Sequence, residues 1–362
     1  MARTARIRTH VLRLEAQTLD IPLLEPFTIA TGAVDTARNI LVRVTLTDGT
    51  VGLGEGAPFP PSGGETQETA LAAALGMAPL VEGADAAEWR PLAGRLLANF
   101  EHQATARAAV EAAVLDAVTR SWGIPLYQFF GGMSKEVESD ISIPIVTPEH
   151  IVTLARKHVA SGARTIKLKV GTTVDGDLAR VRALREAAPE ANILLDGNQG
   201  FTPVTALQLL DALRHAEIVP ILFEQPVHRH DLEGLRFVTE RAGIPVAADE
   251  AVHTAADALR IARMGAANVI NIKVMKSGLV EALAIAEIAH AANIDLMIGA
   301  MMESRLGCAT SAHLVAGIGG FHFIDLDTPM LLSHDPFTGG YAQSGMVYSL
   351  DPSSPGHGVL ER

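Results

Sequence analysis

The sequence predicts an α/β protein made of an N-terminal α+β domain and a closed barrel of parallel strands. Eight short β-rich runs alternate with helical stretches from about residue 140 onward, whereas the first 130 residues show a different pattern. A length of 362 residues agrees with this, because it exceeds what one small core accommodates and suggests two domains, or one large barrel with an accessory part.

The N-terminal domain is predicted to contain three antiparallel strands followed by helices. Residues 6–20 and 38–58 alternate polar and apolar side chains, and an Asp-Gly turn at 48–49 divides the second stretch. Residues 22–36 contain a proline and a glycine and are predicted to form a loop between the strands. Residues 65–122 are rich in Ala and Leu, with apolar side chains at helical spacing, so helices are expected there.

The barrel prediction rests on the spacing of the β-rich runs. Their starting positions are separated by 24 to 28 residues, and helical stretches fill the intervals. Strands that alternate with helices in this way form parallel βαβ units, and eight consecutive units favour a closed barrel with its functional groups at the C-terminal strand ends. The runs lie at residues 141–146, 165–170, 192–197, 220–225, 244–249, 268–273, 294–299 and 321–327.

The domain boundaries follow from the same patterns. Gly and Pro become frequent from about Met330, and no further βα unit follows. We therefore expect the α+β domain at residues 1–130, the barrel at 131–328, and a C-terminal segment at 329–362 that packs back on the first domain.

Composition excludes several classes of function. With 29 Lys and Arg against 41 Asp and Glu, the formal charge is −12, which argues against nucleic acid or an anionic membrane surface as a partner. A single cysteine, Cys308, excludes an internal disulfide and a zinc site built from thiolates. No apolar run reaches the roughly 20 residues that a membrane span needs, and no secretory signal is recognisable, so a cytoplasmic protein is expected.

The barrel strands carry charged residues in one phase. Side chains alternate between the two faces of a strand, so the apolar residues of each run define its outer face and leave the charged residues inside. Lys276 follows Lys273 by three residues, has the opposite phase, and is predicted to lie off the catalytic face. The predicted inward set is Lys167, Lys169, Asp196, Glu224, Asp249, Lys273, Asp325 and Asp327.

Three carboxylates on successive strands, flanked by lysines, point to proton transfer assisted by a metal. Asp and Glu are rarely buried unless they are paired or bind a metal, and converging carboxylate oxygens suit Mg²⁺. A dication and like-charged neighbours would lower the pKa of the lysines toward the range of a general base. Any one of these residues alone is equally consistent with a salt bridge at the barrel rim. Six of them in phase argue against that interpretation.

The ordered motifs resemble those of the enolase superfamily, specifically its muconate-lactonizing-enzyme subgroup. The resemblance covers essentially the whole chain. It implies a modified TIM barrel, (β/α)7β, beneath an α+β capping domain that the C-terminal segment completes. The matching stretches are GLGEGAP (52–58), TIKLKVG (165–171), LLDGNQGF (194–201), FEQPV (223–227), AADE (247–250) and NIKVMKSG (271–278).

The resemblance also implies roles for the charged residues. Lys169 and Lys273 would be the acid and base on opposite faces of the substrate. Lys167 would support the developing oxyanion or the substrate carboxylate on the metal. Relatives of this type often form symmetric oligomers, so a homo-oligomer is expected. The implied ligands of one Mg²⁺ per subunit are Asp196, Glu224 and Asp249.

Asp325 and Asp327 narrow the expectation within the subgroup. A D-x-D at the end of the eighth strand resembles that of the dipeptide epimerases, in which two carboxylates hold the free α-ammonium group of the substrate. The implied reaction inverts the α-carbon of the C-terminal residue through an enediolate, by removal of a proton on one face and return on the other. Alternatively, Asp327 only caps the turn before Thr328-Pro329.

Two other functions stay open from the sequence. A muconate cycloisomerase, or an o-succinylbenzoate synthase/N-succinylamino-acid racemase, would use the same lysines and metal on a substrate that lacks a free ammonium group. An alternative of another class is a catalytically silent barrel that binds a metal or ligand. The complete set of lysines and carboxylates argues against the silent barrel, because such a protein has no chemical need for both bases.

The substrate's side chains are predicted from two regions. Relatives that act on Ala-Glu usually carry an Arg in the loop between the first two strands, whereas Val34 stands at that position here, which favours an apolar second residue. Met302 and Glu303, at the end of the seventh barrel strand, are expected to complete the substrate site, with Met providing an adaptable apolar wall. Asn198 and Glu250 are expected to support the neighbouring metal ligands.

Overall fold

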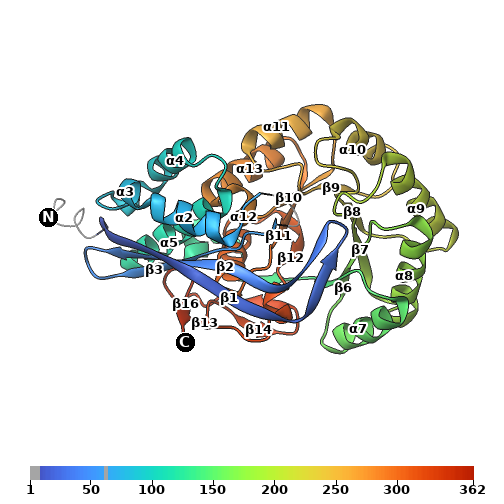
Figure 1. Ribbon diagram of the computed structural model, residues 1–362, viewed down its shortest axis with the longest axis horizontal. Helices are drawn as coiled ribbons and strands as arrows, with labels where there is room; N and C mark the ends of the chain where they lie inside the picture. Colours follow the sequence, from blue (N-terminus) through green and yellow to red (C-terminus); the bar gives the residue numbers. More distant parts are fainter. Residues whose placement is uncertain (1–8, 61–63) are drawn as a thin grey trace.

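An antiparallel cap lies against a nearly closed barrel of eight parallel strands (Figure 1), which confirms the predicted fold class. This computed structural model describes residues 9–60 and 64–362. The beginning of the predicted first strand, at residues 6–8, therefore lies outside the described residues.

The cap contains the three predicted antiparallel strands, β1 (Val11–Ile29), β2 (Gly32–Leu46) and β3 (Val51–Gly56). The predicted turn at 48–49 is confirmed, since the Leu46 N–H donates to the Thr50 carbonyl at 2.8 Å. Gly54 allows β3 to lie directly on the long helix α5 (Ala104–Trp122), because a Cβ there would come within 2.0 Å of a helix carbonyl. The other helical segments of the cap are α2 (Gln67–Gly76), α3 (Ala78–Val81), η2 (Ala86–Glu88), α4 (Trp89–Asn99) and α6 (Leu126–Phe129).

The predicted loop at residues 22–36 is wrong. These residues form the end of β1 and the start of β2, with a register shift between Pro22 and Phe27. The proline at 26 lies within that shift and the glycine at 32 lies at the turn, so both interrupt the hairpin without ending it. Figure 1 shows this hairpin, in blue, reaching from the cap to the barrel. There the Thr28 carbonyl accepts a hydrogen bond from the Ile145 N–H at 2.9 Å.

The barrel strands follow one another in chain order, each parallel to the next. The first and last strands are bridged beyond their ladders, since the Asp140 N–H donates to the Ile324 carbonyl at 2.7 Å. The strands are β5 (Ile141–Ile143), β6 (Thr165–Lys169), β7 (Asn192–Asp196), β8 (Leu222–Glu224), β9 (Val246–Ala248), β10 (Val269–Ile272), β11 (Asp295–Gly299) and β12 (Phe321–Asp325).

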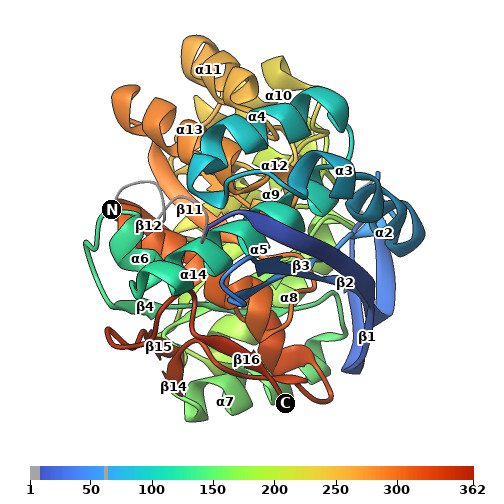
Figure 2. The same cartoon turned by 90° about the vertical axis from the view of Figure 1, so that its left-hand side faces the viewer.

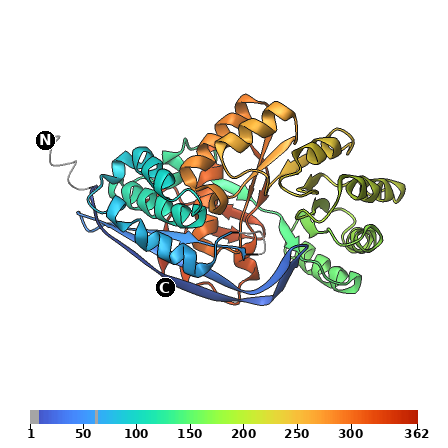
Figure 3. The ribbon, with the colours of Figure 1, turned by 45° about the horizontal axis from the view of Figure 1, so that its top comes forward.

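Seven helical connections separate these strands and form the outer layer of the barrel (Figure 3), as (β/α)7β requires. Threonine side chains at 147, 173, 202 and 254 cap the first turns of four of the helices by accepting a backbone N–H. Within the described ranges we find no helix with the length and apolarity to cross a bilayer. The helices are α7 (Pro148–Ala160), α8 (Val174–Ala187), α9 (Pro203–His215), α10 (Leu232–Thr239), α11 (Ala255–Met264), α12 (Val274–Ser277) with α13 (Leu279–Ala291), and α14 (Arg305–Ile318).

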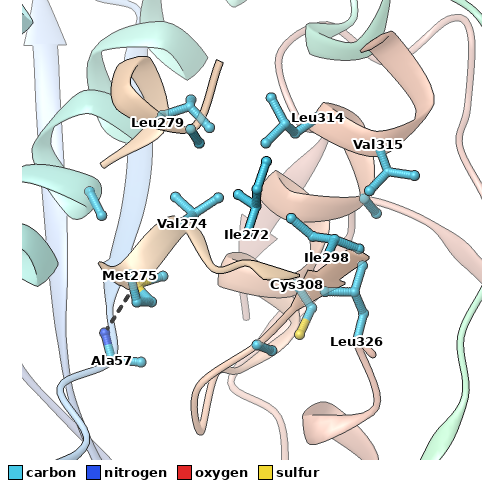
Figure 4. Packing of buried hydrophobic residues seen from close by; sticks show 14 of the residues in the cluster. Ala57, Ile272, Val274, Met275, Leu279, Ile298, Cys308, Leu314, Val315 and Leu326 are labelled. Atoms are coloured by element: carbon cyan, nitrogen blue, oxygen red, sulfur yellow. Dashed lines mark hydrogen bonds between the residues drawn. The ribbon is translucent and has the colours of Figure 1, made fainter. Parts of the chain in front are cut away.

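Alternation along the strands divides the apolar residues into two clusters. The outward residues join the main core with the helices. In Figure 4, Ile272 and Ile298 face Leu314 and Cys308 of α14, so Cys308 is a small buried core residue. The inward residues form a separate layer inside the barrel. That layer consists of Leu194, Leu222, Ala247, Val269 and Met297.

The C-terminal segment packs against the cap and against α14 (Figure 2). The buried Asp116 of α5 accepts the backbone N–H of His357, and Arg120 donates to the Val359 carbonyl at 2.7 Å. The segment contains η3 (Thr328–Leu331), β13 (Phe337–Gly339), β14 (Ala342–Ser344), β15 (Val347–Ser349) and β16 (Val359–Glu361), and β15 pairs with β4 (Glu136–Glu138).

Candidate active site

The charged residues gather at the C-terminal ends of the barrel strands, directly above the inner apolar layer. Asp196 follows the inward Leu194 by two positions, and Glu224 follows Leu222 in the same way. Because residues two positions apart lie on one face of a strand, each charged side chain points to the same side as the apolar residue beneath it. Lys169 and Lys273 line the resulting cavity. Ten charged side chains of this region are buried: Lys167, Lys169, Lys273, Lys276, Asp196, Glu224, Asp249, Glu250, Asp325 and Asp327.

Lys167 occupies the centre of the carboxylate cluster. Its Nζ lies 2.6 Å from Asp325 Oδ2, 2.7 Å from Glu224 Oε2 and 3.2 Å from Asp196 Oδ2. The side chain has no exposed surface. Lys167 thus pairs with carboxylates of three different strands. These contacts suit a lysine that holds the carboxylates in place and balances their negative charge.

Lys169 and Lys273 lie on opposite sides of the barrel. Lys169 ends β6 and Lys273 directly follows β10, four positions away in the order of eight strands. The Lys169 Nζ is 2.6 Å from Asp196 Oδ2, and the Lys273 Nζ is 2.9 Å from Asp249 Oδ2. Two ammonium groups therefore face one cavity from opposite walls, the arrangement that the sequence predicted for an acid and a base.

Lys276 lies outside the residues that line the cavity, but it contacts one of the predicted metal ligands. Its Nζ lies 2.5 Å from Asp249 Oδ1 and 3.1 Å from the Asn271 carbonyl. The chain leaves the β conformation after Ile272 and turns into the short helix α12, so strand alternation no longer applies at position 276. The helical turn brings Lys276 back toward the carboxylates from behind.

The carboxylates around Lys167 and Lys273 raise the pKa values of these two lysines. Burial by itself lowers the pKa of Lys167, but Asp325, Glu224 and Asp196 outweigh it and raise the pKa well above its usual range. For Lys273, burial is likewise outweighed by Asp249, and the pKa is raised. The lowering predicted from the sequence depends on a dication beside the lysines and stays a prediction.

Polar neighbours make hydrogen bonds to the carboxylates of the cluster. The Asn198 backbone N–H donates to Asp196 Oδ1 at 2.9 Å, and its side-chain amide donates to Glu250 Oε1 at 3.4 Å. Asn271 donates to Glu224 Oε1 at 2.7 Å. Asn198 and Glu250 therefore belong to one network with the predicted metal ligands.

The donor set fits a divalent cation. Among the described residues, no group of three or more His, Cys, Asp or Glu side chains is arranged to hold a metal ion. Instead, Asp196, Glu224 and Asp249 each face an ammonium group. The six carboxylates named above, together with the buried Asp140 near Lys167, nevertheless outnumber the four buried lysines, an excess of 7 − 4 = 3 negative charges if all are ionised. Burial and the neighbouring Asp196 raise the pKa of Glu224 to about 8, which shows this excess.

Two buried oxygen atoms without a hydrogen-bond donor also fit a cation site. Glu250 Oε2 and Asn198 Oδ1 are buried, and neither has a hydrogen-bond donor within the part of the chain that the structure describes. Buried polar atoms without a partner are costly, so these oxygens fit a site that takes a cation or its water ligands. The chemistry of all these donors is oxygen, which Mg²⁺ prefers.

Asp325 and Asp327 form a second acidic group at the end of β12. Although burial raises the pKa of Asp325, the charges of Lys167, Lys169 and Lys273 lower it to about 2. Burial and the adjacent Asp325 raise the pKa of Asp327 to about 7. Asp327 precedes η3 but makes no side-chain cap bond; its Oδ2 accepts from the Ser142 N–H at 2.6 Å. Helix capping therefore does not account for Asp327.

The apolar walls of the cavity come from the cap and from the loop after β11. Phe27, Ile29 and Phe59 line it from the cap, with Met301 and Met302 from the barrel. The aromatic ring of Phe27 lies 6.0 Å from the Lys169 ammonium. The long hairpin that the sequence did not predict thus forms part of the site.

A second, larger groove shares Phe59 and Met302 with this cavity. Val34 lines the groove together with neighbouring residues of β2, and Arg38 lies in it as well. Glu303 lines neither cavity: it is buried behind the wall, where its Oε1 accepts from the Met301 N–H at 2.9 Å. The predicted specificity residues Val34 and Met302 therefore line one groove. Glu303 stabilises the loop that forms the wall of this groove.

Several residues that line the cavity were missed in the sequence. Ser142 lines the cavity, and its position between the outward Ile141 and Ile143 already placed it on the inner face of β5. Phe27 and Phe59 had no such signal, because they reach the cavity only through the packing of the cap on the barrel. Glu55 of β3 holds that packing together by accepting from the Ser304 hydroxyl at 2.6 Å.

Comparison with known proteins agrees with the fold and with the motifs. The family model for the mandelate racemase/muconate lactonizing enzyme N-terminal domain matches residues 13–131. The model described as enolase C-terminal domain-like matches residues 150–360.

Several relatives are similar over nearly the whole chain. An aromatic dipeptide epimerase from Herpetosiphon aurantiacus is 47% identical over 353 residues, which cover 97% of this chain and 99% of that protein. An L-Ala-D/L-Glu epimerase from Bacillus subtilis is 33% identical, with coverage of 97% and 96%. The crystal structure of a dipeptide epimerase from Enterococcus faecalis, complexed with Mg and L-Leu-L-Tyr, is 34% identical with a TM-score of 0.94 and covers 97% of this chain and 100% of that chain.

Both family models and the full-length similarity agree with the ordered motifs and with the barrel beneath its cap. The chain belongs to the mandelate racemase/muconate lactonizing enzyme family of the enolase superfamily.

Proposed function

We propose that the protein is a Mg²⁺-dependent dipeptide epimerase that inverts the α-carbon of the C-terminal residue and prefers an apolar side chain there. One observation carries this proposal: two lysines face the cavity from opposite walls beside a D-x-D pair that also lines it. The names of the relatives support the same activity.

The residues divide into two groups with separate tasks. Lys169 and Lys273 move the α-proton, one removing it from one face of the carbon and the other returning a proton on the opposite face. Asp196, Glu224 and Asp249 would hold Mg²⁺, which when bound would stabilise negative charge on the substrate carboxylate. Glu250 and Asn198 keep the metal ligands in place.

Asp325 and Asp327 bind the free ammonium group of the dipeptide in this proposal. Both carboxylates line the cavity, and two acidic groups two residues apart make a compact site for a cation. A muconate or N-succinyl substrate offers no such cation, so the buried acidic pair favours a dipeptide over those alternatives.

The pKa of Asp327 predicts how activity depends on pH. With its pKa raised to about 7 by burial and by Asp325, Asp327 is protonated below that pH and cannot attract the ammonium group. We expect kcat/KM for a dipeptide to fall as the pH decreases through about 7. In Asp327→Asn the contribution of Asp327 to this acid limb should be lost, whereas the contribution of Glu224, whose pKa is raised to about 8, should stay. A pH profile of kcat/KM from pH 5 to 9 measures both, and an unchanged limb in the variant would contradict the assignment.

The activity itself is tested by proton NMR in D₂O. The protein is incubated with Mg²⁺ and pooled L,L-dipeptides whose second residue is acidic, apolar or basic. The proposal expects loss of the C-terminal α-proton signal and appearance of the L,D diastereomer, most rapidly in the apolar pool. Exchange that requires N-succinyl amino acids instead would favour the racemase, and no exchange with any substrate would favour the silent barrel.

Val34 allows a direct test of side-chain specificity. Val34 contributes an apolar side chain to the groove, whereas a guanidinium at this position would pair with a substrate carboxylate. Since hydrogen bonds to charged groups contribute about 1.5–3 kcal/mol, Val34→Arg should shift the kcat/KM ratio of L-Ala-L-Glu to L-Ala-L-Phe upward by about 10-fold or more.

Two control variants show whether the charge of the new side chain causes the change in specificity and whether Arg38 already binds an acidic substrate. Val34→Met adds length without charge and should leave L-Ala-L-Glu a poor substrate. Arg38→Met tests whether the arginine already present in the groove reads an acidic side chain. A large loss of L-Ala-L-Glu turnover in Arg38→Met would contradict the apolar preference.

A further inference from the structure

The end of β8 holds a buried glutamine that the proposed mechanism does not use. Gln225 directly follows Glu224, has no exposed surface, and adopts a positive φ of 30°. A non-glycine residue in this region of φ is uncommon and persists only where its surroundings hold it. The contacts of Gln225 show what holds it and what it holds in turn.

The side chain of Gln225 continues the ladder between β8 and β9. The backbone pairing of these strands ends at Glu224 and Ala247. Beyond that point Gln225 Oε1 accepts the Asp249 N–H at 2.8 Å and the Ala251 N–H at 3.1 Å. Its Nε2 donates to the Val227 carbonyl at 3.0 Å, so both ends of the amide are satisfied.

Asp249 is held from its other side by Lys276. The Lys276 Nζ is 2.5 Å from both the backbone carbonyl and Oδ1 of Asp249. Gln225 therefore fixes the backbone N–H of Asp249, and Lys276 fixes its carbonyl and one carboxylate oxygen. The other oxygen, Oδ2, lies 2.9 Å from the ammonium of Lys273, which lines the cavity.

We propose that Gln225 is a positioning residue that sets the distance between Glu224 and Asp249, and thereby shapes the cation site. The inference rests on the proposed role of these carboxylates in binding Mg²⁺. Gln225 is neutral, so replacing it alters the geometry of the carboxylates without altering the charge of the site. A residue that only stabilised the fold would affect unfolding but not the affinity of the folded protein for Mg²⁺.

Gln225→Met tests the proposal, because methionine has a similar length and lacks the amide acceptor. Loss of partners behind metal ligands typically weakens metal binding 10- to 100-fold. We therefore expect the Kd for Mg²⁺, measured by isothermal titration calorimetry on EDTA-treated protein, to rise by about that factor. The apparent KM for Mg²⁺ should rise in parallel, while kcat at saturating Mg²⁺ changes much less.

Two further variants keep the test decisive. Gln225→Asn tolerates a positive φ but is one methylene too short to reach both N–H groups, so it should also weaken Mg²⁺ binding if Gln225→Met fails to fold. Gln208→Met, on the exposed face of α9, is the matched control and should bind Mg²⁺ like the unsubstituted protein.

The outcomes separate this inference from the proposed function. If the unsubstituted protein binds no Mg²⁺, the proposed function fails and the inference fails with it. If the unsubstituted protein binds Mg²⁺ and a folded Gln225 variant matches its Kd within twofold, only the positioning role is overturned.

Discussion

Replacing either Lys169 or Lys273 with Ala is expected to abolish epimerisation. Proton transfer by a positioned side chain contributes about 10²- to 10⁴-fold to a rate, and here each lysine acts on a different face of the α-carbon. We expect kcat to fall by at least about 10³-fold in each variant. Measuring the interconversion of the two diastereomers of one dipeptide by NMR gives this number directly.

The exchange of the α-proton for deuterium distinguishes the two lysines. If each lysine serves one face, Lys169→Ala should still exchange the proton of one diastereomer, and Lys273→Ala should exchange that of the other. Lys157→Ala, on the exposed face of α7, is the control and should exchange both. Exchange of both diastereomers by either active-site variant would contradict the two-base assignment, whereas retained Mg²⁺ binding would show that the site is otherwise intact.

Replacing Asp325 or Asp327 with Asn is expected to reduce kcat/KM for dipeptides by about 10- to 100-fold, the range given by 1.5–3 kcal/mol for a hydrogen bond to a charged group. The effect should be larger for Asp325, because its Oδ2 also lies 2.6 Å from the Lys167 ammonium. In Asp327→Asn the carboxylate is lost, while the amide oxygen can still accept from the Ser142 N–H.

Substrates without an ammonium group provide the control for these two variants. An N-acetylated dipeptide offers no ammonium group for the acidic pair to bind. We therefore expect its turnover to be slow and to be little affected by Asp327→Asn. Steady-state kinetics with the free and the acetylated dipeptide give the comparison. An equal loss for both substrates would mean that Asp327 acts on the structure of the site and not on the amine.

Much of the site was predictable because it depends on strand periodicity. In a parallel barrel, a residue two positions beyond an inward apolar side chain points into the same interior, so Asp196 and Glu224 follow from Leu194 and Leu222. The chain order of eight βα units also placed their C-terminal ends together. Strand alternation alone was enough to predict that the lysines and the D-x-D pair point inward, without knowledge of which residues they contact.

Periodicity and local propensity did not account for two parts of the structure. Lys276 lies one helical turn beyond a strand, and only the turn of α12 directs its ammonium to Asp249. Residues 22–36 were predicted as a loop because a proline and a glycine interrupt them, yet they pair as a hairpin that reaches the barrel. Neither the local propensity nor the spacing of these residues contains the long-range contact that holds them.

The fold class, the alternation of charged and apolar residues in the barrel, and the set of inward charged residues all follow from the order of the residues along the chain. Which carboxylate faces which lysine, and in which direction the pKa values shift, depends on the tertiary structure. It also decided that Phe27 and Phe59 of the cap form a wall of the site. The reason is physical: strand periodicity is a property of neighbouring residues, whereas ion pairs, burial and the seating of the cap depend on residues far apart in the chain.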